Sequence, residues 1–241
     1  MKVTKIEEEP FTYSPVDEDW QRRICATFGW PFENASKPST VQEECDVDKH
    51  RQPNRHTSIV GDGNCWYRTV AYIATGSEDN YRAVKKSILQ YMKHNAEMLQ
   101  QHYETRLYAI EEICNNANLK LPLSNTLPKD FIQDLIKKHE DQNKNVWADN
   151  VIMELTAAML KTPYYLYFGE TIKTDARCIS LEKSMAADIW NNRDKLKDVP
   201  AHTVKPTMKG AMFILYINRE HFEPAHNGLQ RIRKSKIIHD V

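Results

Sequence analysis

The residues with the clearest chemical potential form the run from Gly61 to Arg68, which reads Gly-Asp-Gly-Asn-Cys-Trp-Tyr-Arg. Cys65 directly precedes an apolar helical pattern, so its thiol is expected at or near a helix N-terminus, where unpaired amides favour the reactive thiolate. Gly61 and Gly63 can adopt backbone conformations closed to other residues, which lets the loop aim its amides at a developing oxyanion. The run therefore indicates a nucleophilic cysteine. A small buried apolar group is what Cys65 alone would indicate.

A thiol nucleophile also needs a general base and a group that fixes the tautomer of that base. Near the other end of the chain, a strong strand pattern over residues 211–217 is followed by a short turn and then by His221-Phe222-Glu223. Cys65 and His221 are 221 − 65 = 156 positions apart, which is no obstacle for partners that meet only in the fold. The two ends of the chain thus supply the residue types of a cysteine hydrolase.

The run from Asp62 to Arg68 resembles the nucleophile motif of the ovarian-tumour (OTU) family of cysteine proteases, which remove ubiquitin and related modifiers from proteins. His221-Phe222-Glu223 is similar to the histidine motif of that family. Trp147, before a helix that leads into a strand, is a further point of resemblance, although Ala148-Asp149 stand where family members often have two glycines. The resemblance covers about residues 59–229 and implies an α+β fold, the OTU-like cysteine protease fold with a small central β-sheet flanked by helices.

Carried over residue by residue, the resemblance implies that Cys65 is the nucleophile, that His221 is the general base and that Asp62 supports the nucleophile loop. Glu223 stands at the position that usually orients the histidine, where the family commonly has Asp or Asn. The side chain of Glu223 is one methylene longer, so the orienting role is expected of Glu223, of Asp62, or of both.

Backbone amides of Gly63, Asn64 and Cys65 are expected to bind the oxyanion. The implied reaction transfers an acyl group from an isopeptide bond to Cys65 and then hydrolyses the thioester, with no cofactor and no metal. Ubiquitin, polyubiquitin or a ubiquitin-like modifier is the implied partner. Three alternatives stay open: a weak or inactive OTU module that binds ubiquitin, an OTU-like protease that processes a polyprotein of a virus or mobile element, and a scaffold protein with a chance cysteine motif.

Hydrophobic periodicity and capping signals predict the helices and strands that carry these residues. Helices are expected over residues 65–75, from Ser77 to about 94, over 97–115, after Pro128 and from Asp149 or Asn150 to about 163. Strands are expected over 164–168, 178–181 and 211–217. The polar run 139–145 is expected to be a surface loop, and four histidines outside the motifs are expected at the surface, namely His50, His56, His202 and His226.

Composition sets the remaining expectations. The 241 residues suit an N-terminal extension over 1–55, partly disordered with one docked element near 20–32, an OTU-like domain over 56–230 and a basic tail over 231–241. Lysine plus arginine equal aspartate plus glutamate at 33 each, so no global field draws the chain to nucleic acid or membranes. Five scattered cysteines without a Cys-x-x-Cys pair favour a reducing compartment, cytoplasmic or nuclear, or the host cytosol for a pathogen protein.

Overall fold

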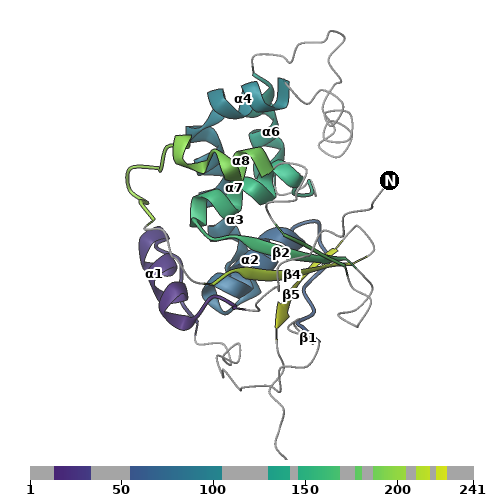
Figure 1. The fold of residues 1–241 in the computed structure, drawn as a ribbon. Coiled ribbons are helices and arrows are strands. Elements are labelled where there is room, and N and C mark those ends of the chain that lie inside the picture. The colour runs from purple at the N-terminus through teal and green to yellow at the C-terminus, as the bar shows by residue number, and fades with distance from the viewer. Residues whose placement is uncertain are drawn as a thin grey trace, which may run out of the picture.

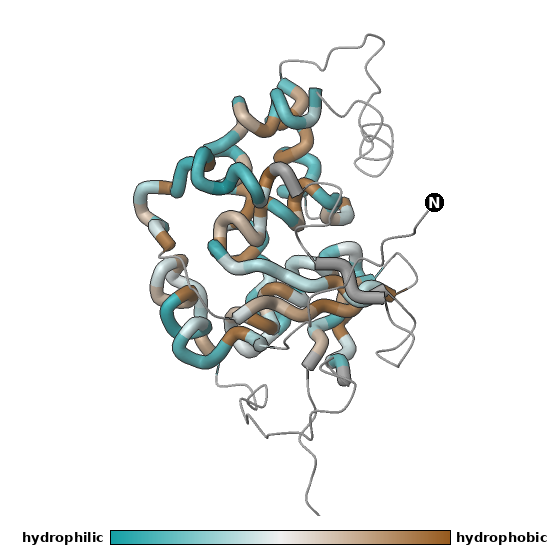
Figure 2. The backbone as a smooth tube through the Cα atoms, in the orientation of Figure 1, coloured by the Kyte–Doolittle hydropathy of each residue, from teal (hydrophilic) through white to brown (hydrophobic). Residues whose placement is uncertain are grey.

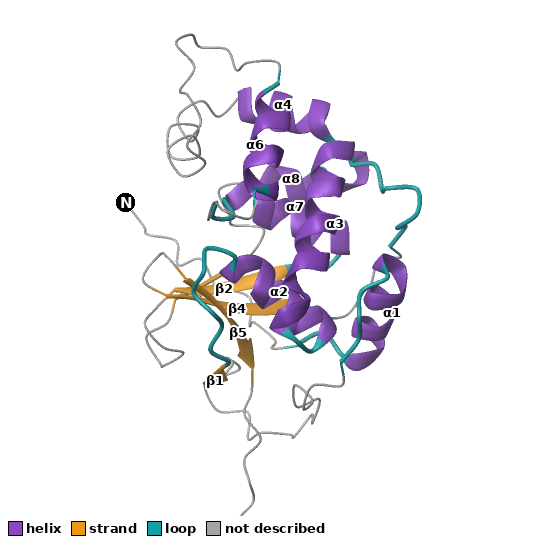
Figure 3. Cartoon of the chain, turned by 180° about the vertical axis from the view of Figure 1, so that it is seen from behind, coloured by secondary structure: helices purple, strands orange, loops and turns teal. Residues whose placement is uncertain are grey.

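The computed structural model describes residues 14–33, 55–104, 130–141, 146–168, 177–180, 187–204, 210–217 and 221–226. These residues form a mixed β-sheet with helices gathered on one side of it (Figures 1 and 3). Its strands, in the order β1-β5-β4-β2-β3, are β1 (Arg55–His56), β5 (His221–His226), β4 (Met212–Ile217), β2 (Tyr164–Phe168) and β3 (Arg177–Ser180). The neighbours β2 and β4 are parallel and the other pairs are antiparallel. The expected α+β class is confirmed, and the predicted strands at 164–168, 178–181 and 211–217 are β2, β3 and β4.

The described α-helices are α1 (Glu18–Phe28), α2 (Cys65–Thr75), α3 (Tyr81–His94), α4 (Ala96–Glu104), α6 (Phe131–Glu140), α7 (Asn150–Leu160) and α8 (Ala187–Asn191). Short 3₁₀ turns lie at η1 (Glu78–Asn80) and η3 (Arg193–Lys195). The side chain of Asp149 caps α7 by accepting from the amide of Ile152 at 2.8 Å, as a short acceptor at this position should. The helix expected over 97–115 is described only to Glu104. No described helix is long and apolar enough to cross a bilayer.

Side chains alternate between the two faces of the sheet along each strand, so neighbouring residues belong to different buried clusters. Leu166 on β2, Ile214 on β4 and Phe222 on β5 belong to the large hydrophobic core on the helical side. Their strand neighbours face the other way, so that Phe213 and Leu215 belong to a smaller buried cluster. Brown, hydrophobic stretches run along the sheet and the helices that cover it (Figure 2).

Helix α1 belongs to the same core as the sheet. Its Trp20 is 2% exposed, and the indole nitrogen donates to the hydroxyl of Thr162, just after α7, at 2.9 Å. The side-chain amide of Gln21 donates to the carbonyl of Ile73 on α2 at 2.7 Å, so α1 is tied to two other helical segments. The docked element expected near 20–32 is therefore present. The domain limits at residues 55 and 230 stay a prediction, because 34–54 and 227–241 lie outside the described residues.

We expect Ile24→Ala to destabilise the whole domain by about 2–5 kcal/mol, because the side chain of Ile24 is fully buried against the core. Arg23→Ala, on the exposed side of the same helix, is the matched control and should change stability by about 0.5 kcal/mol or less. Denaturant unfolding followed by tryptophan fluorescence measures both. Equal stability of the two variants would show that α1 does not belong to the cooperative unit.

Candidate active site

Helix α2 packs against strand β5 and places Cys65 beside the start of that strand. The hydroxyl of Thr69 donates to the backbone carbonyl of Phe222 at 2.9 Å, and the rings of Trp66 and Phe222 meet edge to face at 5.3 Å. Backbone amides of Phe222, Trp66 and Cys65 itself hydrogen-bond to the Cys65 sulfur when it is ionised. The sulfur therefore lies against the residue next to His221.

The imidazole of His221 lies between the nucleophile loop and Glu223. A methyl group added at Gly61 would stand 3.9 Å from both Nδ1 and Cε1 of His221, so that edge of the ring faces the loop that leads to Cys65. Nε2 of His221 lies 3.4 Å from Oε1 of Glu223. The carboxylate thus faces one ring nitrogen and leaves Nδ1 directed toward the loop. The described contacts therefore place Glu223 beside the ring of His221, and the Cys65 sulfur beside the backbone of Phe222, the next residue along β5.

Glu223 also contacts a histidine that the sequence did not single out. Its second carboxylate oxygen, Oε2, pairs with Nδ1 of His56 on β1. His56 is exposed, as predicted, and its side chain is 32% exposed, but nothing in the sequence indicated its pairing with Glu223. His202 likewise pairs with the carbonyl of Thr27 at 3.0 Å. His50 and the side chain of His226 lie outside the described residues.

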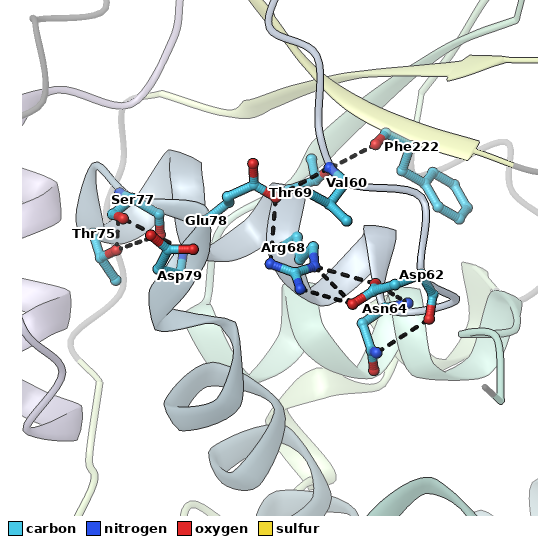
Figure 4. Close-up of polar contacts among 10 residues, drawn as sticks. All are labelled: Val60, Asp62, Asn64, Arg68, Thr69, Thr75, Ser77, Glu78, Asp79 and Phe222. Carbon is cyan, nitrogen blue, oxygen red and sulfur yellow. Dashed lines mark hydrogen bonds and ion pairs between the residues drawn. The ribbon is translucent and has the colours of Figure 1, made fainter. Parts of the chain in front are cut away.

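Asp62 is held by Arg68 rather than by a histidine (Figure 4). The guanidinium of Arg68 donates to both carboxylate oxygens of Asp62, with the shortest contact 2.7 Å, and reaches Glu78 at 3.4 Å. Glu78 in turn accepts from the amide of Val60 at 3.1 Å. Burial raises the pKa of Asp62, but hydrogen bonds from Arg68 and Asn64 outweigh it and leave the pKa below its usual value. Arg68 and Glu78 fix both sides of the loop before Cys65.

The turn before Cys65 depends on glycine. Gly63 has φ = 76°, in the left-handed region where a side chain is strained. The amide of Asn64 donates to Oδ1 of Asp62 at 3.0 Å, so of the three amides expected to bind an oxyanion, that of Asn64 already has an acceptor. The side-chain oxygen of Asn64 accepts from Lys85 at 2.8 Å, which anchors the residue before the nucleophile to α3.

A buried polar cluster lies behind this turn. The hydroxyl of Tyr67 pairs with Nδ1 of His139 at 3.0 Å, and the ammonium of Lys85 lies 5.1 Å from the centre of the Tyr67 ring. His139 is 1% exposed near the end of α6, so the prediction of a surface loop beginning at this residue is wrong. Burial, with the nearby charge of Lys85, lowers the pKa of His139 to about 3, and burial lowers that of Lys85 to about 8. His139 is thus held neutral at physiological pH.

The surroundings of Cys65 favour the protonated thiol over the thiolate. Burial raises the pKa of Cys65 and outweighs the hydrogen bonds from the amides of Phe222, Trp66 and Cys65, while the charge of Asp62 raises the pKa further. The helix N-terminus is expected to favour the thiolate, and its amides do lower the pKa. Cys65 is only 5% exposed, however, and the loss of hydration raises the pKa by more than the amides lower it. Attack by this sulfur therefore requires a base to remove its proton.

No family model matches the sequence of this chain, and no curated protein matches it. In structure the chain resembles solved OTU domains. The OTUD1 OTU domain is 13% identical with a TM-score of 0.42, over 71% of this chain and 85% of that one. The viral OTU domain protease from Farallon virus is 16% identical with a TM-score of 0.41, over 70% and 82%. The Hazara virus OTU bound to ubiquitin is 15% identical with a TM-score of 0.37, over 70% and 79%. At identities this low, the function of the chain has to be inferred from its own residues and contacts.

We expect alkylation of Cys65 to rise with pH along a curve whose midpoint lies above that of the same cysteine in unfolded protein. The sign follows from the raised pKa, because less thiolate is present at any given pH in the folded state. Iodoacetamide labelling across a pH series, with the Cys65 peptide quantified by mass spectrometry in native and urea-unfolded protein, measures the two midpoints. A native midpoint below the unfolded one would mean that the thiolate is already formed at rest.

Proposed function

We propose that the chain is a thiol-dependent deubiquitinase, with Cys65 as nucleophile and His221 as general base. The observation that carries the proposal is the meeting of two distant segments at the start of β5. The backbone of Phe222 lies close enough to the Cys65 sulfur to lower its pKa, and Gly61 of the same loop borders the ring of His221. A nucleophile, a base and a carboxylate on the far side of that base are the parts that acyl transfer needs.

The reaction begins with transfer of the Cys65 proton to Nδ1 of His221, the ring nitrogen on the side of the loop. The sulfur attacks the isopeptide carbonyl, and the carbon–nitrogen bond breaks as the imidazolium returns its proton to the leaving lysine amine. Water, deprotonated by His221, then hydrolyses the thioester and frees the carboxylate of the modifier. Because the thiol starts protonated, the base contributes to the first step rather than only to the second.

Glu223 supplies the orienting group in this proposal. Its carboxylate lies 3.4 Å from Nε2 of His221, whereas the contacts of Asp62 are with Arg68 and Asn64. A carboxylate beside Nε2 keeps the proton on that nitrogen and leaves Nδ1 unprotonated, which is the tautomer a base must have. Asp62 shapes the loop, and the amides of Gly63 and Cys65 are proposed to bind the oxyanion, since the amide of Asn64 donates to Asp62.

Ubiquitin as the substrate follows from the resemblance of the Asp62–Arg68 run and of the histidine motif to those of OTU proteases. The Hazara virus OTU domain was solved bound to ubiquitin, and the proposal extends that kind of partner to this chain. A nucleophile that works as a free thiol also suits a reducing compartment, either the cytoplasm or the nucleus.

A ubiquitin probe with an electrophile at its C-terminus should form a covalent adduct with the protein, and Cys65→Ala should abolish it because the sulfur is the bonding atom. The adduct is read as a mass increase on denaturing gels. Cys25→Ser is the matched control, because Cys25 is also buried but lies on α1 with its sulfur near the carbonyl of Ala74, so this variant should still be labelled.

Labelling that persists in Cys65→Ala would assign the nucleophile to another residue. Stable binding of diubiquitin to the wild-type protein without cleavage would make the chain a ubiquitin-binding module.

Glu223→Gln should lower kcat roughly 10²–10⁴-fold, because an amide can present its N–H₂ to Nε2 and no longer fixes the productive tautomer. Asp62→Asn should lower kcat by about fivefold at most, because it weakens a partly exposed ion pair that holds the loop. Steady-state cleavage of ubiquitin carrying a C-terminal fluorophore compares the two. The reverse order of effects would transfer the orienting role to Asp62.

A further inference from the structure

We propose that His56 is a positioning residue of this site: it holds the Glu223 carboxylate in the orientation in which Glu223 orients His221. The inference rests on the proposed function, since it concerns how the same site is set for catalysis. It adds a second histidine, from an element outside both motifs, to the residues that determine the rate.

The register of the sheet brings His56 to this place. His56 on β1 is the cross-strand partner of Ala225 on β5, and side chains at 221, 223 and 225 share one face of β5. His56 therefore lies on that same face and diagonal to Glu223, within reach for a long side chain. The strand β1 is only two residues long, yet it delivers this one imidazole to the buried carboxylate.

The contacts divide the carboxylate of Glu223 between two histidines. Oε1 faces Nε2 of His221 at 3.4 Å, and Oε2 pairs with Nδ1 of His56. The side chain of Glu223 is 6% exposed, while those of His221 and His56 are 24% and 32% exposed. A buried carboxylate needs partners for both oxygens, and His56 supplies the partner of Oε2.

The longer side chain of Glu223 explains why a second contact to its carboxylate matters. Glutamate has one more rotatable bond than the Asp or Asn common at the corresponding position of OTU proteases. Without a second contact, the carboxylate could turn away from Nε2 of His221 and lose its effect on the tautomer. A donor fixed on the neighbouring strand removes that freedom, so His56 and the extra methylene of Glu223 act as a pair.

The proposed role requires one placement of the ring protons. An ionised carboxylate only accepts hydrogen bonds, so Nδ1 of His56 and Nε2 of His221 both carry protons toward Glu223. His221 then presents an unprotonated Nδ1 to the nucleophile loop. His56 needs only the neutral tautomer protonated at Nδ1 to donate, so the contact requires no additional buried charge.

The rival role for His56 is a purely structural clip between β1 and β5. A clip would affect folding stability, whereas a positioning residue affects turnover through Glu223. Thr57 supplies the control variant, because it is the next residue along the chain and its hydroxyl ties the same segment to Tyr72 of α2 at 3.4 Å. Thr57→Val therefore removes this tie to α2 while both His56 and Glu223 stay in place.

The test compares His56→Ala, His56→Asn and Thr57→Val for cleavage of ubiquitin carrying a C-terminal fluorophore, with unfolding midpoints measured alongside. His56→Ala should lower kcat roughly 10- to 100-fold, with KM unchanged, because the base is misplaced while substrate binding is intact. His56→Asn, whose side-chain amide can donate from nearly the position of Nδ1, should recover most of the rate. Thr57→Val should keep the wild-type kcat.

A double-mutant cycle shows whether His56 acts through Glu223. In a Glu223→Gln background, His56→Ala should cause no further loss of kcat, because the group that it positions is already removed. Wild-type kcat in His56→Ala, or a full additional loss in the Glu223→Gln background, would overturn the positioning role.

Failure of the proposed function would look different, since no variant, wild type included, would then cleave ubiquitin. In that case the rate of Cys65 alkylation by chloroacetamide at a fixed pH still reports on the base. Slower alkylation in His56→Ala, recovered in His56→Asn, would support the positioning role, and equal rates in all three proteins would reject it.

Discussion

The contact between the first turns of α2 and the first residues of β5 is the constraint on which the site depends. Thr69 binds the carbonyl of Phe222, Trp66 packs on its ring, and the sulfur of Cys65 lies against its amide. One residue of the strand is thus held from three positions of the helix. Because His221 is adjacent to Phe222, this packing also sets where the imidazole stands relative to the nucleophile loop.

The packing of the core behind this contact keeps α2 and β5 in place relative to each other. Trp66 is 1% exposed, and its indole nitrogen donates to the hydroxyl of Thr156 on α7 at 3.2 Å, while its ring also meets Tyr164 of β2 edge to face. The helix that carries Cys65 is therefore fixed to the sheet and to the next helical layer at once. Packing of this kind holds catalytic groups more closely than loops can.

The loop before Cys65 is stiffened by charge rather than by apolar packing. Arg68 lies between Asp62 and Glu78 and also sits over the ring of Tyr81, 4.0 Å from its centre. Glu78 extends the network to the amide of Val60. Through these contacts Asp62 holds the loop in place, and its described partners are Arg68 and Asn64.

Much of the scaffold could be predicted from local sequence. The start of α2 at Cys65, its end before Gly76 and the cap at Asp149 follow from rules that involve neighbours in the chain, and the structure has all three. The strands β2 and β4 are apolar runs of the expected length. Such features need no knowledge of how distant segments meet.

The features that sequence reasoning missed depend on distant contacts. His56 belongs to a two-residue edge strand whose register with β5 is set by the whole sheet, and no local pattern marks it. His139 was assigned to a loop because it begins a polar run, yet α6 continues to Glu140 and buries the ring against Tyr67. The direction of the Cys65 pKa shift was missed because the helix end is visible in sequence and the burial is not.

The proposed reaction depends on proton transfer between Cys65 and His221. Its most direct test is the rate of the first chemical step, measured as the burst of fluorophore released from a ubiquitin C-terminal conjugate in a single turnover, for the wild type and for His221→Asn. We expect a fall of roughly three orders of magnitude or more in that rate, with the circular dichroism spectrum and unfolding midpoint of the variant unchanged. A burst of undiminished rate in His221→Asn would show that the imidazole at the start of β5 is not the base.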